Sequence, residues 1–286
     1  MKLYKNLTLD AERALYGEHN ISVESCRFDG PLDGESAIKE CREVKVSDSY
    51  FNLRYPFWHT TDLAILDSEL TALCRAALWY SENVDIKNSK LHGIKALREC
   101  RNVTISQSSV ISAEFGWFSD NVTLTDSNLE GEYVFLRTSN IKMSEVKQKG
   151  KYSFQYIENS TFENCNFDTK DAFWHAKNVT VRNSVIKGEY LAWYSEGLTL
   201  ENCTVIGTQP LCYAKGLRLI NCRMIDADLS FERSEVEASL TEPIISIKNP
   251  LSGTVTVPLV KEMIFDDKCA RGIVVTPEMT YKNSLK

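Results

Sequence analysis

The chain has 286 residues, 43% of them hydrophobic, and is therefore long enough and apolar enough to bury a substantial core. Its formal net charge of -6, from 33 basic and 39 acidic residues, argues against a surface that binds a polyanion, so nucleic acid is not expected as a partner. The lack of any window of about 18 consecutive apolar residues argues against a membrane span.

The N-terminus and the cysteines indicate the compartment. Met1 to Asn6 lack the apolar stretch of a secretory signal, so a cytoplasmic location is expected. The nine cysteines are an odd number without C-x-x-C spacing, which predicts neither a disulfide framework nor a zinc or iron–sulfur site. They are expected to be reduced and buried, and the sequence implies no metal and no cofactor.

A repeat fills most of the chain. Residues 1–19 precede it and are expected to form an N-terminal cap, because the terminal strands of a solenoid have unpaired edges. The first copies start at Asn20, Glu43, Asp62 and Asn83, and the first and third of these steps are longer than those that follow. Later copies follow at a constant period of about 19 residues and start at Asn102, Asn121, Asn140, Asn159, Asn178, Gly197 and Gly216.

The spacing of apolar residues within each copy predicts strands. Counting the first residue as position zero, positions 1 and 3 (Val84 and Ile86) and position 8 (Leu91) are apolar and are expected to face inward. Position 6 is small, and Asn or Gly at position zero tolerates the left-handed backbone of a corner. The sequence therefore predicts an all-β fold, a single-stranded parallel β-helix of about eleven rungs with three short strands each.

The third strand, over positions 12 to 16, carries most of the aromatic residues. Alternation predicts that positions 13 and 15 face inward, with Trp174 and Trp193 filling the interior, and that positions 12, 14 and 16 face outward. An outward aromatic surface of this extent indicates a binding site or an interface. The residues predicted to bind a ligand there are Tyr133, Arg137, Tyr152, Phe154, Tyr156, Phe173, Tyr190 and Tyr194.

Two clusters on this surface contain side chains suited to proton transfer. Asp171 and His175 lie four residues apart on the outward side, among tyrosines of neighbouring rungs. A His beside stacked tyrosines is more often a structural residue, and that interpretation is favoured. Glu40 and His59 fall at position 16 of consecutive rungs, where they could form a pair.

Irregular features of the repeat indicate further residues and loops that could belong to a functional site. Lys39 and Arg98 fall at position 15, which is expected to face inward, and an unpaired charge there would be costly. The two long steps predict small loops within residues 30–40 and 71–80, and such loops often gather on the functional face of a solenoid.

The repeat fades after Glu242, and residues 243–286 are expected to form a C-terminal β cap. The predicted organisation is thus a cap over 1–19, the β-helix over 20–242 and a cap over 243–286, within one structural domain.

Several phrases, taken with the repeat, resemble a bacterial family of unknown function, domain of unknown function 3737. They are Glu12–Tyr16, Gly34–Glu40 and Ser246–Pro250. The family is similar to the pectin-lyase-like β-helix proteins, so the resemblance implies a right-handed coil over nearly the whole chain. It transfers no catalytic residue, because the family has no assigned chemistry.

These observations favour a cytosolic binding or scaffold protein whose aromatic outer face contacts a carbohydrate-like ligand or a protein partner. One alternative is a glycan lyase or hydrolase that uses Asp171 or His175 for proton transfer. Another is a homodimer with the aromatic face as its interface. No G-x-S-x-G, P-loop or H-E-x-x-H motif occurs, so the sequence gives no support for an enzyme. Whether the protein is an enzyme stays open.

Overall fold

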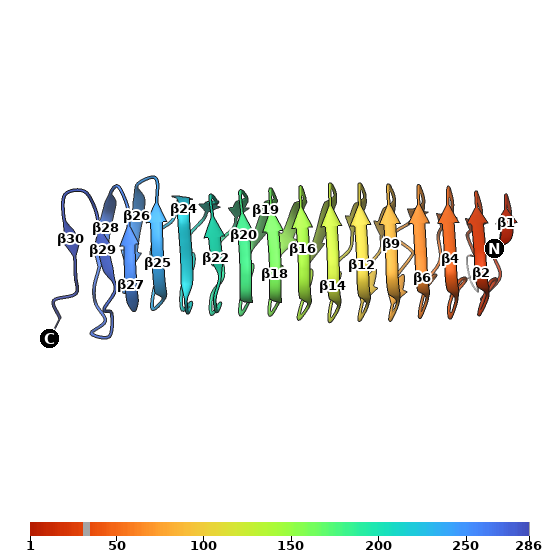
Figure 1. Ribbon diagram of the computed structural model, residues 1–286, viewed down its shortest axis with the longest axis horizontal. Helices are drawn as coiled ribbons and strands as arrows, with labels where there is room; N and C mark the ends of the chain where they lie inside the picture. The colour runs from red at the N-terminus through yellow and green to blue at the C-terminus, as the bar shows by residue number, and fades with distance from the viewer. Residues whose placement is uncertain (31–34, 286) are drawn as a thin grey trace. The chain divides into compact units, whose positions relative to one another are not determined.

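The computed structural model describes residues 1–30 and 35–285. These residues form strands and turns, and no α-helix occurs among them. None of them forms a helix long and apolar enough to cross a membrane. Their contacts define two compact units, Met1–Lys147 and Gln148–Lys286, and within each unit the successive long strands lie side by side and point the same way (Figure 1).

Each rung of the first unit starts with a long strand. These strands are β1 (Lys2–Lys5), β2 (His19–Glu24), β4 (Arg42–Ser47), β6 (Thr61–Leu66), β9 (Glu82–Lys87), β12 (Arg101–Ser106), β14 (Asp120–Thr125) and β16 (Ser139–Ser144). A shorter strand follows in most rungs: β3 (Arg27–Phe28), β5 (Tyr50–Phe51), β7 (Glu69–Leu70), β10 (Lys90–His92), β13 (Ser109–Ile111) and β15 (Asn128–Glu132). Neighbouring long strands pair in parallel and in register, so that Val103 lies between Val84 and Val122.

The second unit repeats this arrangement. Its long-strand series is β18 (Glu158–Glu163), β20 (Lys177–Arg182), β22 (Thr199–Glu201), β24 (Leu217–Ile225), β25 (Glu235–Leu240), β27 (Ser252–Thr256) and β29 (Ile273–Val275). Its other strands are β17 (Lys147–Lys151), β19 (Asn166–Lys170), β21 (Val185–Lys187), β23 (Thr204–Ile206), β26 (Ile244–Lys248), β28 (Val260–Ile264) and β30 (Thr280–Tyr281).

The predicted all-β parallel solenoid is confirmed, but the predicted number of rungs is too low. The two units together contain about 14 turns rather than about eleven. The difference arises because the coil continues into both segments that were expected to be caps. β1 pairs in parallel with β2, and β25, β27 and β29 also pair in parallel.

Side-chain ladders hold the corners of each unit. The Asn102 amide donates to Asn83 Oδ1 at 3.0 Å, and the Asn121 amide donates to Asn102 Oδ1 at 2.8 Å. These corner residues have φ near +55°, as expected for position zero. At position 6 the Ser89 N–H donates to Ser108 Oγ at 3.1 Å, which explains the preference for a small hydroxyl residue there.

The cysteines are free thiols, and eight of the nine are buried, whereas Cys269 is exposed. The expectation that all nine are buried is therefore wrong for Cys269. Burial raises the pKa of the Cys74 thiol to about 11, so this group stays protonated and serves as packing material.

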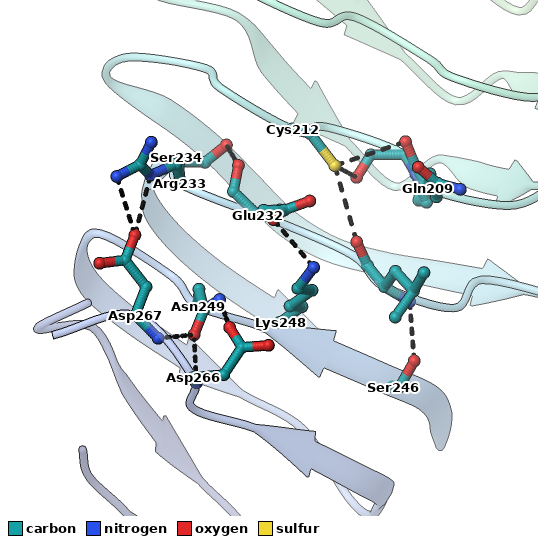
Figure 2. Close-up of polar contacts among 12 residues, drawn as sticks. Gln209, Cys212, Glu232, Arg233, Ser234, Ser246, Lys248, Asn249, Asp266 and Asp267 are labelled. Atoms are coloured by element: carbon teal, nitrogen blue, oxygen red, sulfur yellow. Dashed lines mark hydrogen bonds and ion pairs between the residues drawn. The ribbon is translucent and has the colours of Figure 1, made fainter. Parts of the chain in front are cut away.

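Polar contacts join the later rungs of the second unit to one another (Figure 2). The Arg233 guanidinium lies 2.9 Å from Asp267, and Lys248 Nζ lies 3.0 Å from Glu232. Asn249 is buried and its Oδ1 accepts the Asp267 N–H at 3.2 Å. The segment after β26 is thereby joined to the rungs before it.

The third side of the rungs is mostly a series of turns, and the prediction of a third strand is wrong for most rungs. The strands on this side of the described rungs are β8 (Leu78–Trp79), β11 (Leu97–Arg98), and β26 and β28 near the end of the second unit, where Ile247 of β26 bridges to Ser230. In the second unit the backbone is left-handed at positions 12, 14 and 16, with φ of +53°, +59° and +55° at Asp171, Phe173 and His175. Side chains alternate between faces only along an extended strand, so positions 13 and 14 both turn inward here.

This geometry makes the phenylalanine at position 14 a core residue. Phe173 is buried and packs at 4.9 Å from the Phe154 ring, with an interplanar angle of 18°. It also meets Phe162 and Phe167 edge to face. The packing of these rings stabilises a left-handed backbone that bulky residues otherwise avoid.

We expect Phe173→Ala to lower the free energy of unfolding by about 3–5 kcal/mol, because it leaves a cavity among packed rings. Urea denaturation followed by fluorescence measures the change. The matched control is Ile220→Ala, since Ile220 is exposed in the same unit and its loss is expected to change stability by about 0.5 kcal/mol or less. Equal effects of the two substitutions would contradict the core assignment.

Candidate functional site

The tryptophans at position 15 face outward, and the expectation that they fill the interior is wrong. Trp79, Trp174 and Trp193 are half-buried. Each indole N–H donates to a backbone carbonyl of the next rung, at 2.7 Å from Trp79 to Lys95, 2.6 Å from Trp174 to Tyr190 and 2.8 Å from Trp193 to Gln209. These indoles therefore join consecutive rungs along the outside of the turns.

The outward direction of position 15 also explains Lys39 and Arg98. The expectation that their charges face the interior is wrong: Lys39 Nζ lies 5.1 Å from the ring of Trp58, and the Arg98 guanidinium lies 5.0 Å from the ring of Trp79. Trp58 and Trp79 stack at 5.3 Å. The cations are stabilised by the indole faces, so these residues are no sign of local irregularity.

Position 16 carries a second series of rings in the second unit, which we call the outer ladder: Tyr156, His175, Tyr194 and Tyr213. Consecutive ring centroids are 4.6, 5.1 and 5.0 Å apart, with interplanar angles of 8°, 10° and 13°. Each inner ring is covered on both faces by its neighbours. The outer ladder consequently presents mainly ring edges to solvent.

The residues predicted to bind a ligand separate into three groups. Tyr133, Arg137, Tyr156 and Tyr194 are exposed, and Tyr152 and Tyr190 are half-buried. Phe154 and Phe173 lie in the core, so the prediction that they face outward is wrong. The cause is the left-handed backbone at position 14, which no alternation rule anticipates.

Asp171 and His175 lie on one turn but are not joined by a hydrogen bond or an ion pair among the described residues. Asp171 is only 6% exposed, and burial raises the pKa of its carboxyl group, while Lys170 at 3.9 Å opposes that shift. Burial lowers the pKa of His175, which favours the neutral imidazole within the outer ladder. The pKa values of Asp171 and His175 are thus shifted by the burial of each group and not by each other.

The first unit contains a hollow surface that we call the lateral groove. It consists of two hollows of about 700 and 630 Å³ that share Tyr80. The residues that line it are His19, Glu40, Arg42, Glu43, His59, Thr61, Tyr80, Ser81, Glu82, Glu99, Arg101 and Phe118. The size is typical of sites for small molecules and short oligomers.

The predicted column at position 16 forms one edge of the lateral groove. The Glu40 N–H donates to the Trp58 carbonyl and the His59 N–H to the Trp79 carbonyl, each at 2.9 Å, so Glu40, His59 and Tyr80 occupy successive rungs. Within the described ranges, however, no hydrogen bond or ion pair joins Glu40 to His59. His59 instead packs against Tyr80, with ring centroids 4.9 Å apart and an angle of 32°.

The opposite edge of the groove was missed by the sequence analysis. It contains Arg42, Glu82 and Arg101, which lie two residues after the position 16 column. In the part of the chain that the structure describes, none of these three side chains has an ion-pair partner. The signal in the sequence was the charged residue that recurs at position 18.

The groove does not have the composition of a metal centre. Among residues 1–30 and 35–285, no group of three or more His, Cys, Asp or Glu side chains is arranged to hold a metal ion. Its carboxylates are interleaved with guanidinium groups and rings, which suits hydrogen bonding to a neutral polar ligand.

The fold and the lateral groove define a parallel β-helix with a polar, ring-containing groove along one side. The family described as "Protein of unknown function (DUF3737)" matches residues 2–275, and the chain belongs to it. No curated protein matches the chain.

Several solved structures are similar to the chain. The surface protein and adhesin PfbA of Streptococcus pneumoniae has 10% identity and a TM-score of 0.41, covering 90% of this chain and 91% of that one. The tailspike protein of E. coli bacteriophage HK620 has 9% identity and a TM-score of 0.45, covering 95% and 72%. The A-module of the Azotobacter vinelandii mannuronan C-5 epimerase AlgE4 has 10% identity and a TM-score of 0.35, covering 84% and 89%.

The depressed pKa of His175 leads to a pH prediction. The unfolded state binds a proton below about pH 6.5 more readily than the folded state does, so stability falls as the pH drops through this value. We expect His175→Phe to reduce that loss, measured by urea denaturation between about pH 5 and 7. Burial also lowers the pKa of His92. His92 is therefore replaced by Asn both in the His175→Phe variant and in the protein with which it is compared, so that only His175 differs. An unchanged pH profile would contradict the assignment.

Proposed function

We propose that the protein binds an elongated carbohydrate along the lateral groove of its first unit. The observation that supports this proposal is that Tyr80 lines both polar hollows and so joins them into one surface. A ligand that extends over several rungs would contact equivalent side chains at intervals of about 4.8 Å.

The chemistry of the groove supports a ligand with many hydroxyl groups. Glu40, Arg42, Glu82 and Arg101 supply planar groups that can each form two hydrogen bonds with adjacent hydroxyls. Because these groups have no ion-pair partners in the described residues, binding does not require breaking such a pair. Specificity then arises from the order of acceptors and donors along the column.

Tyr80 is suited to stack on a sugar ring. Its side chain is exposed, and its ring is tilted by 32° from His59 rather than stacked in parallel. The next residue in its column is Glu99, so no aromatic ring follows Tyr80 on that side. In the outer ladder, by contrast, parallel stacking covers the ring faces that a sugar would need. This contrast supports the groove over the aromatic face of residues 133–194.

The cytoplasm is the compartment that we propose for this activity. The free thiols, including the exposed Cys269, suit a reducing environment. The ligand would accordingly be a carbohydrate that is present inside the cell.

The test begins with an array of neutral and acidic oligosaccharides, followed by titration of the best ligand. Trp58 and Trp79 lie next to Tyr80, so binding is expected to change tryptophan fluorescence. We expect Tyr80→Ala and Arg101→Gln each to weaken binding roughly tenfold or more, because each removes a side chain that lines the groove.

The matched control is Tyr194→Ala, which removes an exposed ring of the outer ladder. This variant is expected to bind with the affinity of the wild type. The proposal is overturned if no oligosaccharide binds, or if Tyr194→Ala abolishes binding while Tyr80→Ala leaves it intact.

A further inference from the structure

A second recess of the first unit lies where the repeat departs from its regular length. The rung that starts at Asp62 is longer than the later ones, and Ala72 and Leu73 are the additional residues by pairing of the rungs. They form a tight turn, because the Cys74 N–H donates to the Thr71 carbonyl at 2.9 Å and the Arg75 N–H to the Leu73 carbonyl at 2.7 Å. The turn pushes Leu73 into solvent, where it is 61% exposed.

This turn forms one wall of a recess of about 470 Å³, which we call the insertion recess. Leu53, which is only 3% exposed, lies at its base, and Ile94, which is 41% exposed, lies on the rung after the turn. Glu35 and Arg54 line another side. Residues 31–34, which belong to the loop predicted within residues 30–40, lie outside the described residues.

One part of the lining of the recess is apolar and consists of Leu53, Ala72, Leu73 and Ile94. Leucine and isoleucine side chains as exposed as Leu73 and Ile94, placed on either side of one hollow, are typical of a surface that a ligand covers. Gly93 allows the adjoining rung to come close, because a Cβ there would lie 2.8 Å from the Cys74 carbonyl oxygen. The shape of the recess is therefore set by backbone contacts as well as by side chains.

Two carboxylates and two guanidinium groups line the recess, and only one guanidinium group has no partner within the described part of the chain. Asp29 accepts hydrogen bonds from Arg27 and from Asn52, and Glu35 lies 3.0 Å from Arg54. Arg75 also lines the recess, and it has no ion pair or hydrogen bond through its guanidinium among residues 1–30 and 35–285. The recess thus combines an apolar wall with one guanidinium group that has no direct partner in these described ranges.

We propose that the insertion recess binds an aliphatic carboxylate of medium chain length. The hydrocarbon chain would lie against Leu53, Leu73 and Ile94, and the carboxylate would pair with Arg75. A guanidinium group matches the planar geometry of a carboxylate and forms two parallel hydrogen bonds with it. Asp29 and Glu35 are already paired with Arg27 and Arg54, so Arg75 is the guanidinium group of the recess that is left for the ligand.

The insertion recess is independent of the lateral groove, because the two share no lining residue. A carboxylate in the recess and a carbohydrate in the groove can therefore be tested separately. Failure of one proposal leaves the other unaffected.

The test measures binding of octanoate to the full chain by isothermal titration calorimetry, with 1-octanol as the ligand that lacks the charge. Octanoate is expected to bind more tightly than 1-octanol by roughly tenfold, the effect of one charge-assisted hydrogen-bonded pair. Arg75→Gln is expected to remove this difference. The matched control is Arg218→Gln, an exposed arginine of the second unit, which is expected to leave octanoate binding unchanged.

A deletion of Ala72 and Leu73 tests the recess itself. It restores the rung to the length of the later ones, so the fold is expected to persist, as checked by circular dichroism, while octanoate binding is lost. The proposal is overturned if octanoate does not bind the wild type, if Arg75→Gln binds octanoate as the wild type does, or if the folded deletion variant retains binding.

Discussion

In-register parallel pairing is the constraint on which the other features of both units depend. Each residue lies beside its equivalent one rung away, as Val84, Val103 and Val122 do. A side chain that can hydrogen-bond or stack on its own kind is therefore favoured at every position. The Asn corners, the serine column and the stacked rings are all results of this one geometric condition, because pairing repeats every contact at about 4.8 Å.

Much of the fold could be predicted from the sequence, because the constant period of the repeat and the alternation of apolar residues in strands such as β12 are local signals. The turn side could not be predicted in the same way. At Phe173 the backbone is left-handed despite a bulky side chain, and packing against Phe154 and Phe162 supports that conformation. Tertiary packing overrode the local preference there.

The candidate site was predictable in part. Glu40, His59 and Tyr80 do form one column, because column membership follows from the period alone. Whether a column borders a hollow depends on the curvature of the corner and on the direction of neighbouring side chains, and no repeat encodes these. Alternation along a strand predicted an inward Arg98, whereas its guanidinium lies on the indole of Trp79.

The two-residue turn at Ala72 and Leu73 has a consequence for folding. Rungs of equal length can pair with the wrong neighbour, since a shift by one whole rung preserves most apolar contacts and backbone hydrogen bonds. A rung of a different length cannot shift in this way without a clash or a gap at the turn. The irregular rungs of the first unit therefore favour the correct pairing of neighbouring rungs during folding and disfavour pairings shifted by one rung.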